Sequence, residues 1–302
     1  MPGNTEQQAQ ATLGAGDKQS AVRRYEVPRS AAISIEVYEL GDGPAIVLLP
    51  SLGRGATDML ELAEPLAAAG YRVLCPEPRG NGRSVGPLAD KTLHDWAGDI
   101  AAVIEHAGQA PVVIVGHAHG NWIARTVASD RPDLVRALIL LAGSAGKVPK
   151  DVDAVPIPPE VRAQIERCGD TSLPDAVRLE SLRAVFFAPC NDPAPWLQGW
   201  NTELMTMQTL AQKRTPVDDF FAGGNVPILN VQAEYDVIAP QCYANVLRDY
   251  LGERVTNLTI RDAAHALLPE RLEDVVAAII DYVAALSPAQ SAGLDRRSRE
   301  AF

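Results

Sequence analysis

Residues 116–120 are Gly-His-Ala-His-Gly, which is the spacing of a nucleophile elbow with alanine in place of the usual central serine. Glycine at both ends permits a turn too tight for residues that carry a Cβ. Such a turn aims residue 118 outward and leaves the backbone N–H of His119 at a helix N-terminus, where it can stabilise a developing oxyanion. The methyl group of Ala118 has no lone pair and no proton to give, so this residue cannot act as a nucleophile.

The elements that must hold this turn alternate between strand and helix. Apolar runs predict strands over residues 31–40, 45–50, 71–76, 112–116, 135–143, 226–232 and 255–260. Amphipathic stretches predict helices over 58–70, 92–108 (opened by a threonine cap), 118–130, near 240–251 and over 272–286. The alternation indicates an α/β fold with a doubly wound, mainly parallel sheet that binds ligands at the carboxyl ends of its strands.

The alternation stops between residues 147 and 224, where three segments separated by prolines have helical patterns. An all-helical insertion in an α/β chain predicts a cap over the active face. The chain then divides into a disordered arm (residues 1–22), a core in two parts (23–146 and 225–286), the inserted helical cap (147–224) and a flexible tail (287–302).

Four segments in this order resemble the α/β-hydrolase superfamily, over about residues 30–286. They are IVGHAHGNWIA at the elbow, PEPRGNGRS at 76–84, QAEYDVIAP at 232–240 and DAAHALLPERLEDV at 262–275. The resemblance implies that Asp236 is the catalytic acid and His265 the base, with Glu234 and Asp262 as the fallback acids. In this arrangement the carboxylate fixes the imidazole tautomer and stabilises its charged form.

The resemblance also implies a second oxyanion donor in the loop at 50–55, where position favours the backbone N–H of Leu52. We name Ser51, Arg54, Trp122, Trp196 and Trp200 as candidate substrate contacts. For Arg54 a surface position is the favoured alternative, and for Trp122 a core position. Ser51 and Ser144 are candidate substitute hydroxyls, but neither has the geometry of an elbow.

Three explanations for Ala118 stay open. The chain can be a serine hydrolase inactivated at its nucleophile position, acting on an ester, a lactone or a related acyl or carbon–carbon bond of a small, partly apolar molecule. It can be a native enzyme whose His265–Asp236 pair activates water or removes a substrate proton without a covalent intermediate. It can also be a non-catalytic binding protein, although the retained acid and base argue against this.

The composition of the chain limits the classes of partner and cofactor that we expect. A net charge of −11 argues against nucleic acid and anionic membranes as partners and leaves a small-molecule substrate, with a homodimer as a further expectation. Four scattered cysteines without a C-x-x-C pair argue against a zinc site or a disulfide framework. No phosphate-cradling glycine loop is present, so neither a metal nor an organic cofactor is expected. The N-terminal stretch lacks the apolar run of a signal peptide, which predicts a cytoplasmic protein.

Overall fold

The computed structural model describes residues 21–143, 148–150, 157–243 and 245–286. Its centre is an eight-stranded sheet. The strands are β1 (Arg23–Ser30), β2 (Ile33–Leu40), β3 (Ala45–Leu49), β4 (Arg72–Pro76), β5 (Val112–His117), β6 (Val135–Leu141), β7 (Ile228–Ala233) and β8 (Val255–Ile260). They lie in the order β1-β2-β4-β3-β5-β6-β7-β8. All neighbours from β4 to β8 pair in parallel, whereas β1 and β2 run antiparallel to their neighbours. The predicted α/β class and mainly parallel sheet are confirmed.

Strand β1 was not expected from the sequence. Its residues RRYEVPRS lie at the sheet edge, and Val27 is its one fully buried side chain. An edge strand with one mostly exposed face does not need an apolar run, and Pro28 lies where the register with β2 shifts. Hydrophobic periodicity therefore carries little information about such a strand.

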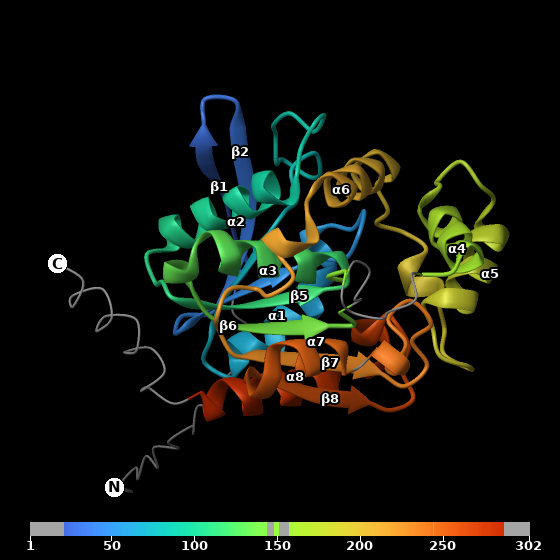
Figure 1. Cartoon of the computed structure of the whole chain (residues 1–302). Helices are drawn as coiled ribbons and strands as arrows, with labels where there is room; N and C mark the ends of the chain where they lie inside the picture. Colours follow the sequence, from blue (N-terminus) through green and yellow to red (C-terminus); the bar gives the residue numbers. More distant parts are fainter. Residues whose placement is uncertain (1–20, 144–147, 151–156, 244, 287–302) are drawn as a thin grey trace, which may run out of the picture.

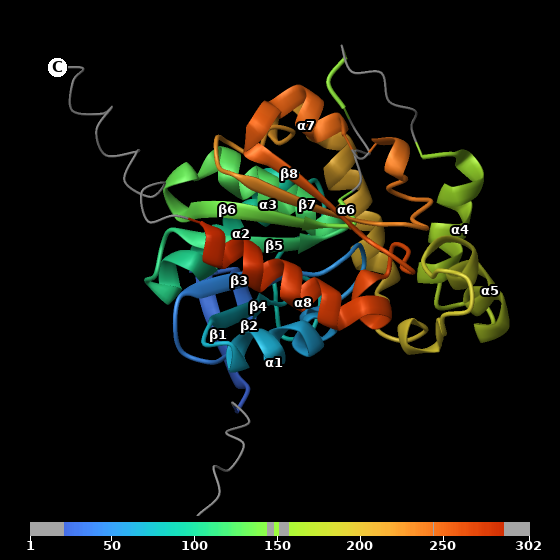
Figure 2. The same cartoon turned by 90° about the horizontal axis from the view of Figure 1, so that it is seen from below.

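Helices cover both faces of the sheet (Figures 1 and 2). On one face α1 (Leu60–Ala68) packs beside α8 (Leu267–Ala285), and on the other α2 (Leu93–Ala107) packs beside α3 (His119–Asp130). Two separate apolar clusters fill these layers. The helix expected near 240–251 is shorter than predicted, because α7 spans Val246–Leu251.

Three helices lie between β6 and β7, as the proline-separated segments predicted. They are α4 (Pro159–Gly169), α5 (Asp175–Val185) and α6 (Thr202–Arg214). Figure 1 shows the arrowheads of the central strands pointing toward this insertion. The insertion thus adjoins the sheet edge at which α/β proteins bind ligands. The predicted arm and tail lie outside the described residues, apart from residues 21 and 22.

Arg54 corrects one expectation, because it is not a surface residue. Its side chain is 2% exposed, and its Nε donates to Asp58 at 2.5 Å. Its Nη1 donates to the carbonyl oxygens of Trp196 at 3.1 Å and Gln198 at 2.7 Å. The guanidinium carbon also lies 4.8 Å from the ring centroid of Trp196 and 5.0 Å from that of Trp200. Arg54 therefore fastens the insertion to the loop after β3.

Replacing Arg54 by methionine should weaken the fold strongly. The substitution leaves Asp58 without its cation and two carbonyl groups without their donor. We expect the free energy of unfolding to fall by roughly 3 to 5 kcal/mol. Urea denaturation followed by tryptophan fluorescence measures this loss.

The matched control is Arg248→Met. Arg248 is half-exposed and faces the exposed Glu253 at 3.6 Å. Such a surface pair contributes about 0 to 1 kcal/mol. Equal urea midpoints for the two variants would show that Arg54 does not fasten the insertion.

Candidate active site

The turn between β5 and α3 has the geometry of an elbow. Ala118 has φ 47° and ψ −109°, a strained backbone conformation for a residue with a Cβ. A Cβ on Gly116 would lie 2.5 Å from the backbone of Gly120, and a Cβ on Gly120 would lie 2.6 Å from the carbonyl oxygen of Leu49. Both glycines are therefore needed for the close approach of α3 to β5 and β3.

Hydrogen bonds hold residue 118 in this conformation. Its backbone N–H donates to the carbonyl oxygen of Leu141 at 2.9 Å, at the end of neighbouring β6. Its own carbonyl oxygen accepts from the backbone N–H of Asn121 at 3.1 Å and also from the Asn121 side-chain amide. The methyl group of Ala118 lines a pocket. The strained turn thus aims position 118 into that pocket, whatever side chain it carries.

Asp236 and His265 form a buried pair on the loops that follow β7 and β8. Asp236 Oδ2 lies 2.8 Å from His265 Nδ1, and Asp236 Oδ1 accepts from the backbone N–H groups of Ile238 and Ala239, both at 2.8 Å. Every oxygen of this carboxylate is therefore bound, which fixes its orientation. His265 lines the same pocket as Ala118, and its Nε2 has no hydrogen-bond partner among the residues that the structure describes.

The two fallback acids lie elsewhere. Glu234 accepts from the backbone N–H of Asp262, and Asp262 pairs with Arg271 at 3.6 Å. Neither carboxylate contacts the His265 imidazole through a hydrogen bond of the described chain. The geometry therefore favours Asp236 as the partner of His265.

Two further histidines are buried beside the elbow. His117 Nε2 donates to the carbonyl oxygen of His265 at 2.8 Å. Burial lowers the pKa of His117 to about 3, with a further lowering by the nearby His265. Burial also lowers the pKa of His119 to about 4. Both imidazoles are therefore neutral at pH 7, because a buried charge without a counter-charge is unfavourable.

Both expected oxyanion donors, the backbone N–H groups of Leu52 and His119, belong to residues that line the pocket with Ala118. His119 is the first residue of α3, so its N–H has no partner within the helix. Leu52 lines the pocket, and its N–H donates to no other described residue in a turn or loop. Both N–H groups are thus available to an oxygen atom of a ligand.

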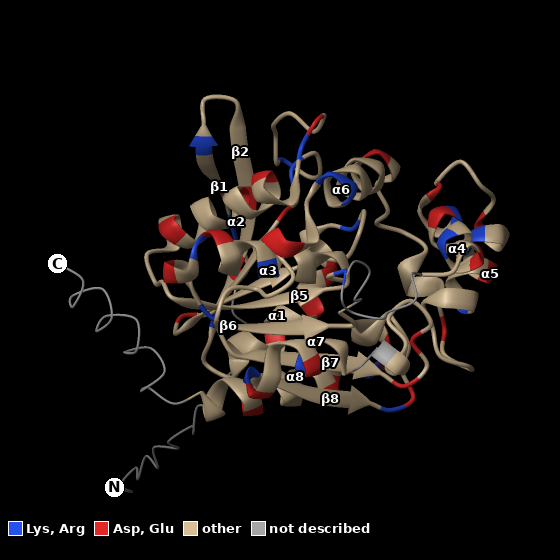
Figure 3. Ribbon diagram, viewed as in Figure 1, with Lys and Arg blue, Asp and Glu red and all other residues tan. Residues whose placement is uncertain are grey.

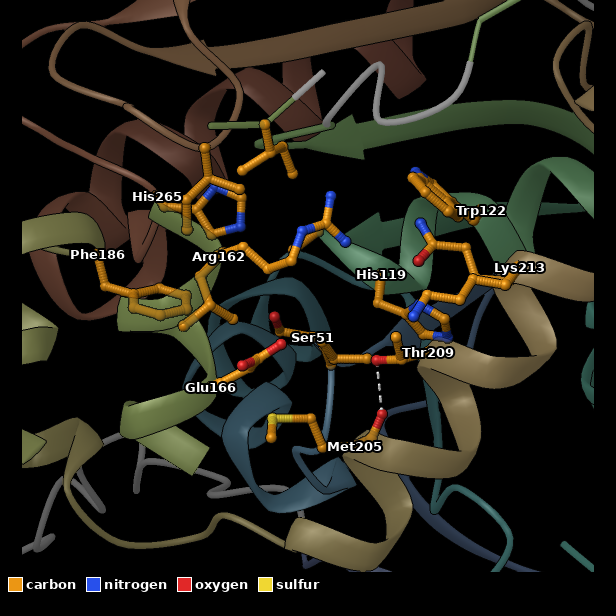
Figure 4. A pocket seen from close by; sticks show the side chains of 16 residues that line it. Ser51, His119, Trp122, Arg162, Glu166, Phe186, Met205, Thr209, Lys213 and His265 are labelled. Atoms are coloured by element: carbon orange, nitrogen blue, oxygen red, sulfur yellow. Dashed lines mark hydrogen bonds between the residues drawn. The ribbon is translucent and has the colours of Figure 1, made fainter. Parts of the chain in front are cut away.

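The pocket lies between the elbow and the insertion (Figure 4) and encloses about 860 Å³, including its open mouth. The core contributes Ser51, Leu52, Ala118, His119, Trp122, Ile238 and His265, and the insertion contributes Ile157, Arg162, Ile165, Glu166, Phe186, Met205, Thr209, Gln212 and Lys213. The described wall is formed by apolar and polar side chains alike, and its charged side chains other than histidine are on the insertion.

Two expected substrate contacts, Ser51 and Trp122, line this pocket, and Trp122 also stacks on Phe220 with ring centroids 5.5 Å apart. Trp196 and Trp200 do not, which corrects the expectation. They pack with Phe186 inside the insertion, and the Trp200 indole donates to the carbonyl oxygen of Trp196 at 2.7 Å. Ser144 lies outside the described residues.

The three charged lining residues were not singled out from the sequence. Arg162, Glu166 and Lys213 lie on the surface-facing helices α4 and α6, where charged residues are usually solvated. Nothing in their spacing distinguishes them from an ordinary helix surface. Within the described ranges, no group of three or more His, Cys, Asp or Glu side chains is arranged to hold a metal ion, and no helix has the length and apolar character needed to span a bilayer.

Known proteins with similar sequences include a thioesterase and an epoxide hydrolase. The palmitoyl-protein thioesterase ABHD10 of Rattus norvegicus is 26% identical over 171 residues, which cover 55% of this chain and 54% of that protein. An epoxide hydrolase of Caballeronia sordidicola is 31% identical over 129 residues, which cover 42% of this chain and 39% of that one. The match thus spans about half of the length of the rat thioesterase and less of the epoxide hydrolase.

A solved structure agrees over most of the fold. The esterase of Exiguobacterium antarcticum superposes with a TM-score of 0.70 at 21% identity, over 84% of this chain and 96% of the esterase. At this identity the likeness concerns the fold alone. The family model described as the alpha/beta hydrolase fold matches residues 44–164, a stretch that includes the elbow and the loops before it. With its sheet order, its elbow and these matches, the chain has the α/β-hydrolase fold.

Proposed function

We propose that the chain hydrolyses an ester, thioester or lactone of a small, partly apolar molecule by general-base activation of water. One observation carries the proposal. The His265–Asp236 pair is fully formed, and His265 presents its free Nε2 to a pocket that also contains Ala118 and two candidate oxyanion donors. The names of the relatives, a thioesterase and an esterase among them, support this substrate class.

The reaction follows from the positions of these groups. His265 Nε2 takes a proton from a water molecule as the water oxygen attacks the acyl carbon, and the carbonyl π electrons move to oxygen. The backbone N–H groups of Leu52 and His119 stabilise that oxyanion. Asp236 stabilises the imidazolium. Collapse of the intermediate breaks the acyl bond, and the leaving oxygen or sulfur recovers the proton from His265 Nε2, which gives an acid and an alcohol or thiol.

The backbone at residue 118 favours a second candidate, an inactivated serine hydrolase. Its φ of 47° is the conformation that aims a nucleophile into the site, and a hydroxyl there would complete a Ser-His-Asp arrangement. Both candidates use the same base and the same oxyanion donors. They differ in whether the attacking oxygen comes from water or from residue 118.

The location and assembly of the protein stay predictions. A cytoplasmic location and a homodimer were expected from the sequence. The rodent and human relatives are named as mitochondrial, which bears on this chain only by likeness.

Variants at residues 118, 236 and 265 test the chemistry. With 4-nitrophenyl hexanoate and the hexanoyl thioester of N-acetylcysteamine, the chain should show slow turnover. His265→Ala should reduce this turnover about 100-fold or more, because it removes the base. Asp236→Asn should cause a similar loss, because the imidazole loses its orienting acceptor. Ala118→Ser should raise the rate and give a burst of acyl-enzyme.

His106→Ala is the matched control, because this exposed histidine lies on α2, away from the pocket. It should leave the rate unchanged. Turnover that appears only in Ala118→Ser identifies the inactivated hydrolase. Turnover of the original chain that survives His265→Ala contradicts general-base catalysis, and no turnover in any variant contradicts both candidates.

The neutral histidines give the site a pH-dependent stability. An unfolded histidine binds a proton near pH 6.5, whereas native His119 does so at about pH 4. Between these values the unfolded state holds more protons, so the free energy of unfolding falls as the pH falls from 6.5 toward 4. Buried Glu77 changes the free energy of unfolding in the opposite direction over this pH range, because burial raises its pKa to about 6. The contribution of Glu77 cancels when each variant is compared with the original chain, because both contain Glu77.

His119→Gln should therefore reduce the loss of stability between pH 7 and pH 4.5 by about 2 kcal/mol. Urea titrations at both pH values measure it. The exposed His106→Gln variant should keep the pH dependence of the original chain. If His119→Gln does the same, His119 is not neutral and buried in solution.

A further inference from the structure

Basic side chains reach the pocket from two helices of the insertion. Arg162 comes from α4 and Lys213 from α6, while Glu166 is the one acidic side chain among the described lining residues. Figure 3 shows basic positions on both helices. The described lining residues thus include two basic side chains and one acidic side chain, in a chain whose net charge is −11. His119 does not alter this balance, because its lowered pKa keeps it neutral.

Arg162 has no side-chain partner among the described residues, whereas Arg54 and Arg178 do. Arg54 pairs with Asp58, and Arg178 donates to two backbone carbonyl groups. For Arg162 there is no hydrogen bond and no ion pair within the described part of the chain. Glu166, one turn further along α4, lines the same pocket but makes no ion pair with it. The guanidinium fork of Arg162 is therefore free to receive a ligand.

Arg162 lines the same pocket as Ala118 and His265. Figure 4 shows its side chain extending from α4 across the pocket, beyond Phe186 and between His265 and Trp122. Apolar side chains of Ile165, Met205 and Phe186 lie in the same wall. A ligand can thus place an apolar segment on this wall, its acyl carbon near His265 and an anionic group on Arg162.

We propose that the preferred substrates carry a carboxylate or phosphate group, which Arg162 binds as the acyl bond lies at His265. This deepens the proposed function and rests on it for the acyl part. Guanidinium binds either anion through two parallel N–H···O bonds. Because Arg162 is exposed, solvent screens the interaction, so its effect on affinity is about tenfold rather than larger.

Two pairs of substrates of equal acyl length distinguish the source of the anion. Mono-4-nitrophenyl adipate and 4-nitrophenyl hexanoate differ by a terminal carboxylate. Hexanoyl-coenzyme A and hexanoyl-N-acetylcysteamine differ by phosphates on the leaving group. In at least one pair the anionic member should have the higher kcat/KM, and Arg162→Gln should lower that preference about tenfold. Glu166→Gln should raise it, because a repelling carboxylate is removed.

Arg167→Gln is the matched control, since this exposed arginine lies on the same helix outside the pocket. Calorimetric titration of the full chain with adipate and with hexanoate measures anion binding without turnover. Adipate binding that weakens in Arg162→Gln but not in Arg167→Gln supports the anion site even if no ester is hydrolysed. The anion site is overturned if Arg162→Gln and Arg167→Gln have the same substrate preference in both pairs and the same affinity for adipate. That result leaves the proposed hydrolysis intact.

Discussion

The close contact between β5 and α3 is the constraint on which the site depends. Gly116 and Gly120 approach so tightly that a Cβ on either would meet backbone atoms, which have no room to move. This contact forces residue 118 into a strained conformation and directs it out of the sheet. It also brings the start of α3 next to the loop after β3. The position of residue 118, the direction of the His119 N–H and the approach of Leu52 therefore have one common cause.

Burial determines which groups can exchange protons at this site. His117 and His119 lie without a counter-charge among apolar neighbours, and their lowered pKa values keep them neutral. His265 is equally buried but contacts Asp236, whose second oxygen is held by two backbone N–H groups. The imidazolium of His265 has an ordered anion beside it, and the other two imidazoles have none. Of the three, His265 is therefore the one suited to accept a proton.

The features that the sequence predicted depend mainly on local rules. Buried strands have apolar runs, the elbow has its paired glycines, and Thr92 caps α2 through reciprocal bonds with Asp95. The features that it did not predict depend on contacts between distant segments. Arg54 is buried because the carbonyl groups of residues 196 and 198 fold back onto it, more than 140 positions along the chain. In the same insertion Trp196 and Trp200 pack with Phe186, whereas Arg162 lines the pocket. The hydrophobic periodicity of a single helix does not predict which of its residues contact distant segments.

The strained elbow has a use even without a nucleophile. It supplies two things at once: a side chain at residue 118 and a backbone N–H at His119 directed to the same space. With alanine at residue 118, only the reactive side chain is missing. In the proposed mechanism the donor remains, and so does the His265–Asp236 pair in the same pocket, so the site would keep the groups that stabilise a transition state and lack the group that forms a covalent intermediate. The attacking atom must then come from solvent or from the ligand itself. A site without a covalent intermediate depends more strongly on holding its ligand in a fixed position than a site with one. The lining residues of the insertion have to hold the ligand in this position.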